Sequence, residues 1–279
     1  MASSTDRADD LDAAPADGLA LTKFLEALLE RERLIVFAGL VLITAVCWLY
    51  LVDMAGSMGG EMVGGMGDMM MLKPWTAGYA VMMFVMWAVM MTAMMIPTAV
   101  PMVLLYALVW RKRVADGNGF AAIGAFTLGY VIVWSAFSVA ATALQWGMEQ
   151  AAMLSPMMVA TSPIVGGLIV IAAGIYQLTP YKHACLKRCR SPIMFLTAGW
   201  RSGADGALRM GLSHGAYCVG CCWALMALLF VGGVMNLLWI AAITLFVLLE
   251  KVVPGGHRVS WISGVGMILF GVGTGAAAL

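Results

Sequence analysis

The stretch LIVFAGLVLITAVCWLYLV, residues 34–52, decides the fold class of this chain. It contains no charged side chain, and a helix of about 20 apolar residues is long enough to span the hydrocarbon core of a bilayer. The rest of the chain has the same character, because 62% of its 279 residues are hydrophobic and only 11% are charged. Soluble domains have about 25% charged residues. We therefore predict an all-α, polytopic membrane helix bundle, and we exclude a soluble enzyme, a nucleic-acid-binding domain and a secreted disulfide scaffold.

Further segments meet the same criterion and bring the predicted number of transmembrane helices to about seven. They cover residues 75–110, 120–144, about 160–180, about 208–231, 234–249 and 259–277. The first of these is too long for one straight span, and Pro97 and Pro101 allow a kink or break there. Residues 1–33 are polar and rich in Ala and Asp, so we predict a disordered acidic tail, followed by a single membrane domain over residues 34–279.

The distribution of Lys and Arg sets the predicted orientation. With seven spans, 15 of the 16 basic residues fall on one side and only Lys73 falls on the other. Cytoplasmic loops carry the excess of basic residues. We therefore predict a cytoplasmic N-terminus, an outside C-terminus, and an outer loop over residues 53–74. Glycines such as Gly211 and Gly215 suit close contacts between helices.

Methionine dominates the predicted outer loop, which holds seven Met between Met54 and Met71 with glycines among them. Met is rarely exposed to water without a reason, and thioethers are soft ligands that select Cu(I). The glycines favour a flexible strap, and a loop that folds back into the membrane is the alternative. The predicted ligands of the loop are Met54, Met58, Met62, Met66 and Met70.

A second group of methionines follows in the next span, where Met82, Met86, Met90 and Met94 recur at every fourth position. This spacing places them on one face of a helix. Met is also an adaptable packing residue, and the pattern agrees equally well with packing and with copper binding. Met90 and Met94 are the candidate ligands of this group.

Five of the six cysteines lie between Cys185 and Cys222, around two predicted helix ends on the cytoplasmic side. Because they are four residues apart, His214, Cys218 and Cys222 share one helix face, and we expect that face to meet Cys185 and Cys189. The alternative is that Cys221 replaces Cys222, since C-x-x-C is the commoner zinc spacing. Thiolates and imidazoles suit Cu(I) or Zn(II). The predicted ligands here are His183, Cys185, Cys189, His214, Cys218, Cys221 and Cys222.

Three motifs resemble a known family. The first runs from Tyr176-Gln177-Leu178-Thr179-Pro180 through Cys185 to Cys189-Arg190-Ser191-Pro192, the second from His214-Gly215 to Cys218-Val219-Gly220-Cys221-Cys222-Trp223, and the third is Trp87 with Met90-Met91-Thr92-Ala93-Met94-Met95-Ile96-Pro97. Together they resemble the bacterial integral membrane proteins grouped as domain of unknown function 2182, described as predicted metal-binding. The resemblance implies a multi-pass protein of the bacterial cytoplasmic (inner) membrane.

The favoured function is copper handling, by binding, delivery or transport of Cu(I), with zinc as the alternative metal. The lipid bilayer and a copper chaperone or metalloenzyme are the predicted partners, with no nucleic acid. A membrane thiol–disulfide oxidoreductase is one alternative, because Cys218 and Cys221 form a C-x-x-C pair. An accessory subunit of a membrane metalloenzyme complex is another. No motif supports hydrolytic catalysis, and the sequence favours a non-enzymatic role. Glu250 is placed at a helix end, so no carboxylate is predicted inside the membrane, where a proton-coupled transporter would be expected to bury some.

Overall fold

The computed structural model describes residues 16–64, 74–114, 119–155 and 158–277. This part of the chain is helical between short connections, and its one bridge of β type joins Leu154 and Ala160. The all-α prediction is confirmed. The helices are α1 (Ala16–Gly64), α2 (Ala77–Arg113), α3 (Gly119–Gln150), α4 (Pro163–Gln177), α5 (Pro180–Arg190), α6 (Pro192–Ala198), α7 (Gly203–Ala227), α8 (Leu229–Gly232), α9 (Leu237–Val252) and α10 (Gly256–Ala276).

All seven predicted spans correspond to helices, but they differ in length. Within the described residues, five helices are long and apolar enough to cross a membrane, and a sixth span results if α4 and α5 are taken together. These two meet at an angle of 64°, because Pro180 begins α5 and the Thr179 side chain caps its first turn by accepting a hydrogen bond from the Lys182 backbone N–H. The remaining predicted span is α9, which has 16 residues and is short against the usual 17–25.

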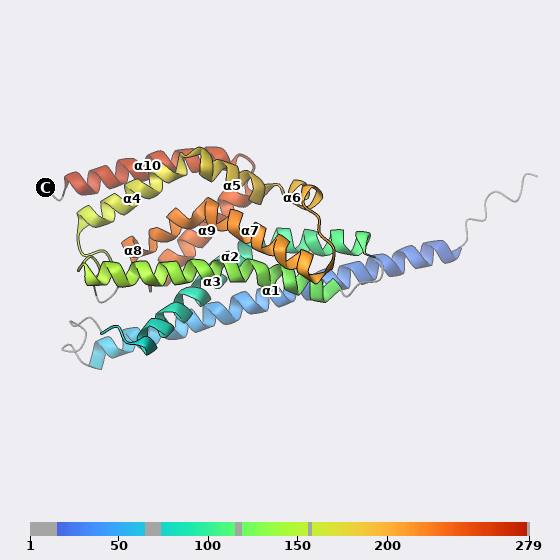
Figure 1. Ribbon diagram of the computed structural model, residues 1–279, viewed down its shortest axis with the longest axis horizontal. Coiled ribbons are helices and arrows are strands. Elements are labelled where there is room, and N and C mark those ends of the chain that lie inside the picture. The colour runs from blue at the N-terminus through green and yellow to red at the C-terminus, as the bar shows by residue number, and fades with distance from the viewer. Residues whose placement is uncertain (1–15, 65–73, 115–118, 156–157, 278–279) are drawn as a thin grey trace, which may run out of the picture.

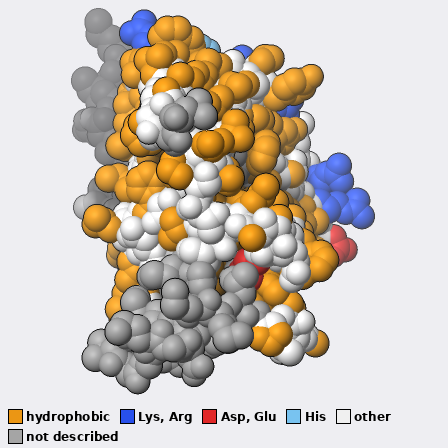
Figure 2. Space-filling view, turned by 90° about the vertical axis from the view of Figure 1, so that its left-hand side faces the viewer, with side chains coloured by type: hydrophobic (Ala, Val, Ile, Leu, Met, Phe, Trp, Pro, Cys, Tyr) orange, Lys and Arg blue, Asp and Glu red, His pale blue; other side chains and the backbone are white. Residues whose placement is uncertain are grey.

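The outer surface of the bundle is apolar. On α1, for example, the side chains of Leu42 and Leu49 are 64% and 69% exposed. The same holds on α3, where Leu128 is 55% exposed, and on α10, where Leu269 is 68% exposed. Figure 2 looks onto the end of the bundle that carries the C-terminus, and there too hydrophobic side chains fill much of the view. Water-soluble monomers rarely expose many large apolar side chains together, so the surface agrees with burial in a bilayer.

The described chain begins and ends at opposite ends of the bundle (Figure 1). Helix α1 starts at one end, where its first turns project beyond the other helices, and α10 finishes at the other end. This arrangement agrees with an odd number of crossings, while the direction relative to the membrane stays a prediction.

We expect the C-terminus to lie outside the cytoplasm, because the excess of basic residues predicts that the opposite end of the bundle lies inside. Alkaline phosphatase fused at Leu279 should therefore be active, and a fluorescent protein fused at the same position should not fluoresce. A fusion after Arg113 serves as the cytoplasmic control. Fluorescence from the C-terminal fusion would contradict the orientation.

Glycines bring two pairs of helices into close contact. Helices α3 and α7 meet at Gly211, where a Cβ atom would overlap the carbonyl oxygen of Phe126, and at Gly215, where it would lie 2.9 Å from the Val133 Cβ. Helices α4 and α10 meet in the same way at Gly167 and Gly271. Small residues let helix backbones approach closely inside membranes, and the predicted role of Gly211 and Gly215 is confirmed.

Helix α1 extends beyond two predicted boundaries. It includes residues 16–33, which we predicted as part of the tail, and residues 53–64 of the predicted outer loop. The rest of that tail and loop, residues 1–15 and 65–73, lies outside the described residues. Glycine weakens a helix by about 1 kcal/mol per residue, but extending an existing helix is far easier than starting one. Similarly, α2 continues through Pro97 and Pro101 without a break.

A buried ion pair ties α5 to α9. The Lys182 ammonium lies 3.0 and 2.8 Å from the two carboxylate oxygens of Glu250, and both side chains are nearly inaccessible. Gln177 and Ser260 donate further hydrogen bonds to this carboxylate, at 3.0 and 2.8 Å. Glu250 lies at a helix end, as predicted, but it is buried in the bundle, because the bent α4–α5 pair and α10 cover it.

Candidate metal centre

Helix α7 carries three cysteines and one histidine into the middle of the bundle. Cys218, Cys221 and Cys222 are 0–2% exposed, and His214 is 4% exposed. The helix is in contact with α3 on one side and with α5 on another. The close approach to α3 at Gly211 and Gly215 sets how near the α7 thiols come to their neighbours.

Cys218 and Cys222 face α2 and α3. The Cys222 Sγ lies 4.0 Å from the Met95 Sδ of α2, and the Cys218 Sγ lies 3.0 Å from the Tyr130 hydroxyl of α3. That hydroxyl also donates a hydrogen bond to the Met95 carbonyl oxygen. We call the three sulfur-bearing residues Cys218, Cys222 and Met95 the sulfur centre.

A lysine completes the surroundings of the sulfur centre. The Lys251 Nζ, from the last turn of α9, donates to the Cys218 Sγ at 3.0 Å and to the Thr98 hydroxyl at 2.8 Å. The sulfur centre thus combines two thiols and a thioether with one cationic neighbour.

Cys221 lies between the sulfur centre and α5. Its side chain interacts with those of Cys189, Cys218 and Cys222, and a Cβ atom at the adjacent Gly220 would lie 2.8 Å from the Cys185 Sγ. The expectation that Cys218 and Cys222 meet Cys185 and Cys189 stays a prediction, and so does the alternative in which Cys221 replaces Cys222. All six cysteines of the chain are free thiols.

The histidines lie outside the sulfur centre. The His214 ring packs among the rings of Phe126, Tyr130 and Phe195, at centroid distances of 5.5–6.0 Å. His183 stacks on His257 at 4.0 Å. The Nδ1 atoms of His183 and His214 are buried without a hydrogen-bond partner.

The α2 methionines form a continuous buried stripe. Met90 and Met94 are fully buried, and the same holds within 1% for their neighbours on the helix, Met83, Met86, Met91 and Met95. The burial of these side chains agrees with the packing interpretation. The same side chains also form a row of thioethers along α2 that ends at Met95 in the sulfur centre.

The loop methionines are only partly described. Met54 is half-buried on α1 and packs against the core. Met58 and Met62 belong to the same helix, although nothing is described of their side chains, and Met66 and Met70 lie outside the described residues.

No group of three or more His, Cys, Asp or Glu side chains in the described ranges has the geometry to hold a metal ion. Structural Zn(II) sites need four such ligands, so the structure gives no support to zinc. The sulfur centre instead offers three sulfur donors, the thiols of Cys218 and Cys222 and the thioether of Met95. Such a set suits Cu(I), which accepts few ligands and prefers sulfur.

Sequence reasoning missed the polar partners of the buried groups. Lys251 was counted only among the 15 basic residues of the predicted cytoplasmic side, and Glu149 was given no role. Glu149 is 6% exposed and accepts hydrogen bonds from Trp75 Nε1 at 2.7 Å and Gln145 Nε2 at 2.8 Å. The side-chain oxygen of Gln145 in turn accepts a hydrogen bond from Trp87 Nε1 at 2.7 Å. These partners could have been suspected from the sequence, because ionisable side chains next to apolar helices are costly and mark functional or paired sites.

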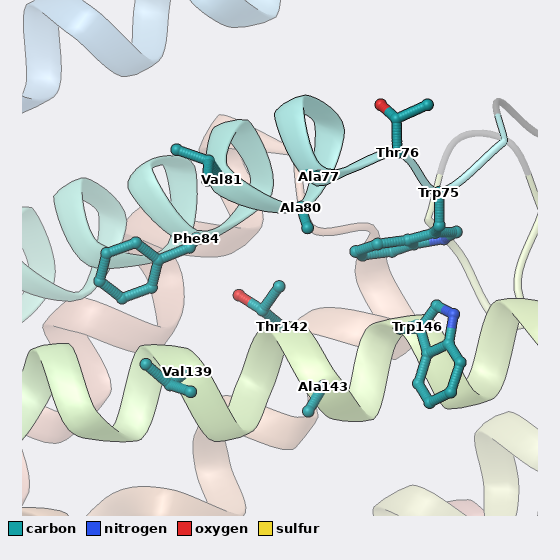
Figure 3. Close-up of a pocket in the computed structure, with 10 residues that line it drawn as sticks. All are labelled: Trp75, Thr76, Ala77, Ala80, Val81, Phe84, Val139, Thr142, Ala143 and Trp146. Atoms are coloured by element: carbon teal, nitrogen blue, oxygen red, sulfur yellow. The ribbon is translucent and has the colours of Figure 1, made fainter.

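An open groove lies between α2 and α3, away from the cysteines. Trp75, Phe84 and Trp146 line it together with Ala, Val and Thr side chains (Figure 3), and its volume is about 560 Å³. Its lining contains no thiol, thioether, imidazole or carboxylate. The groove is therefore no candidate for metal binding.

The fold and the site together define a class: a bundle of helices fit to span a membrane, with a sulfur-rich centre between them. The sequence model of one family, described as PpoB2, copper chaperone, matches residues 84–274, and the chain belongs to this family. Its name differs from that of the family the motifs resemble, but the metal-binding theme is the same. The match includes α7, α5 and most of α2 and leaves out the methionines of residues 54–71. No curated protein and no solved structure matches this chain.

Proposed function

We propose that this protein holds Cu(I) at the sulfur centre inside the bacterial cytoplasmic membrane and delivers it to a copper-requiring protein. The observation that carries the proposal is the contact between the Cys222 and Met95 sulfurs, 4.0 Å apart, with Cys218 one turn from Cys222. Membership of a copper chaperone family supports the choice of metal. The apolar surface and the helices fit to span a membrane support the location.

The chemistry of the donors favours Cu(I) over other metals. Thiolate and thioether sulfurs are soft ligands, and carboxylates, which would attract Mg(II), Ca(II) or Mn(II), are not among the donors. In the structure the Cys222 thiol donates a hydrogen bond to the Cys218 carbonyl oxygen at 3.0 Å. Binding Cu(I) replaces this hydrogen bond, and each coordinating thiol loses its proton to solvent.

The methionines supply the route to this site. The outer methionines from Met54 to Met70 capture Cu(I), and the buried stripe of α2 passes it from Met83 past Met90 and Met94 to Met95. Thioethers bind Cu(I) without a change in charge, so a metal ion can exchange among them inside an apolar bundle. Met95 belongs to both the stripe and the sulfur centre, which makes it the transfer point between them.

Purified protein in detergent should bind Cu(I), and the double variant Cys218→Ser, Cys222→Ser should lose the tightest bound equivalent. Serine keeps the size of the side chain but removes the soft donor. The measurement is a competition titration against a colorimetric Cu(I) chelator. Cys47→Ser, a half-buried cysteine on α1, is the matched control and should bind as the natural sequence does. Equal binding by all three proteins would reject the sulfur centre.

A further inference from the structure

Glu149, the next-to-last residue of α3, is a buried carboxylate without a cationic partner. It is 6% exposed, and the carboxylate that does form an ion pair among the described residues is that of Glu250 with Lys182. The two oxygens of Glu149 instead accept hydrogen bonds from the Trp75 Nε1 at 2.7 Å and from the Gln145 Nε2 at 2.8 Å. Inside a helix bundle ionisable side chains are costly, and they mark ion pathways or paired charges.

The hydrogen bonds around Glu149 suit its ionised form. Trp87 Nε1 donates to the side-chain oxygen of Gln145 at 2.7 Å, and this turns the amide nitrogen of Gln145 towards Glu149. The indole nitrogen of Trp75 and the amide nitrogen of Gln145 can only donate, so both oxygens of Glu149 act as acceptors. The network therefore surrounds one negative charge with side chains that are themselves neutral.

The same network touches the first buried methionine of the α2 stripe. The Gln145 Nε2 lies 3.5 Å from the Met83 Sδ, and both residues are at most 1% exposed. Met95 follows twelve residues later on the same helix, which corresponds to about 18 Å along the helix axis. Glu149 and Met83 thus lie at the end of the stripe that is remote from the sulfur centre and follows the predicted outer loop.

We propose that Glu149 and Met83 form an entry site for a soft monovalent metal ion at the outer end of the stripe. The inference rests on the route in the proposed function and adds a second metal site to it. Thioethers carry no charge, so a Cu(I) ion among them is an uncompensated cation inside an apolar bundle, which is costly. Met83 supplies the soft donor at this site, and the carboxylate of Glu149 supplies the opposite charge close by.

The test uses Ag(I), which has the charge and the sulfur preference of Cu(I), titrated into the full chain in detergent. Trp75 and Trp87 both belong to the network, so an ion bound at Met83 should quench their fluorescence. We expect one phase of the quenching to disappear in Met83→Leu. The Ag(I) affinity of that phase should fall at least about tenfold in Glu149→Gln, because this change removes a full charge near the ion and keeps the size of the side chain.

Two variants serve as matched controls. Met82→Leu changes the partly exposed methionine next to Met83, and Asp53→Asn removes an exposed carboxylate of α1. Both should leave the Met83-dependent phase unchanged. Glu149→Met is a second neutral variant should Glu149→Gln fail to fold. Equal Ag(I) affinity in the natural sequence and in a folded neutral variant, or a titration without a Met83-dependent phase, would overturn the inference.

The double variant Cys218→Ser, Cys222→Ser separates this inference from the proposed function. It should keep the Met83-dependent phase while it loses the tightest bound equivalent of Cu(I). A phase that disappears with the two thiols would belong to the sulfur centre, which would overturn the entry site and leave copper binding intact. A phase that remains in a protein whose Cu(I) binding does not depend on these thiols would reject the sulfur centre and support the entry site.

Discussion

Replacing Gly211 with leucine should prevent α3 and α7 from packing and abolish Cu(I) binding. A Cβ atom at this position would overlap the Phe126 carbonyl oxygen and lie 2.8 Å from its carbonyl carbon, so the obstacle is backbone that no rotamer change can move. The 3.0 Å contact between Tyr130 on α3 and Cys218 on α7 depends on the same helix separation. Overpacking costs about 1–3 kcal/mol where side chains can adjust, and we expect at least the upper end of this range here.

The control for this variant is Gly124→Leu on α3, because a Cβ at Gly124 meets nothing within 4 Å. Both variants add the same side chain to a helical glycine, so helix propensity is matched. Size-exclusion profiles and Cu(I) titrations of the two purified proteins provide the measurement. Normal copper binding by Gly211→Leu would show that the close contact between the helices does not support the site.

Replacing Lys182 with methionine should destabilise the protein by about 3–5 kcal/mol, because it leaves the Glu250 carboxylate buried without its cation. Both partners are almost fully inaccessible, at 0% and 2% side-chain exposure, so water cannot take the place of the lost ammonium. The double variant Lys182→Met, Glu250→Gln removes both charges. It should recover most of the lost stability, since the glutamine can still accept hydrogen bonds from Gln177 and Ser260.

Thermal unfolding in detergent, followed by helical circular dichroism, measures this effect. Lys187→Met is the matched control, because Lys187 lies on the same helix with an exposed side chain. An equal midpoint for Lys182→Met and Lys187→Met would mean that the ion pair contributes nothing. A double variant less stable than Lys182→Met would show that the carboxylate has a favourable role beyond pairing.

The helices could be predicted from the sequence because burial in a bilayer leaves a strong one-dimensional signal. Long uncharged runs such as residues 34–52 locate spans without any knowledge of packing. What failed were the ends: the glycine-containing residues 53–64 continue α1 because a long apolar helix already precedes them. The bend at Thr179 and Pro180 was also beyond a simple count of apolar residues. The predicted span ends there, but the chain continues as a second short helix, α5, with different neighbours.

The site could be predicted only as a set of residues. Periodicity predicts His214, Cys218 and Cys222 on one face of α7, but the helix that this face meets depends on tertiary packing. Gly211 and Gly215 bring α7 close to α3, while Cys221 interacts with Cys189 of α5 as well as with Cys218 and Cys222. The contributions of Tyr130, Thr98 and Lys251 come from three different helices, and no local pattern in the sequence connects them.

The most direct test of the central claim is X-ray absorption at the copper edge of the Cu(I)-loaded protein. With Cys218, Cys222 and Met95 as ligands, the atoms bound to copper should all be sulfur. Met95→Leu should lower the number of sulfur neighbours by one. The control is Met82→Leu, which changes a partly exposed methionine on the same helix and should leave that number unchanged. A first shell that contains nitrogen or oxygen, or one that is unchanged in Met95→Leu, would contradict copper binding at the sulfur centre.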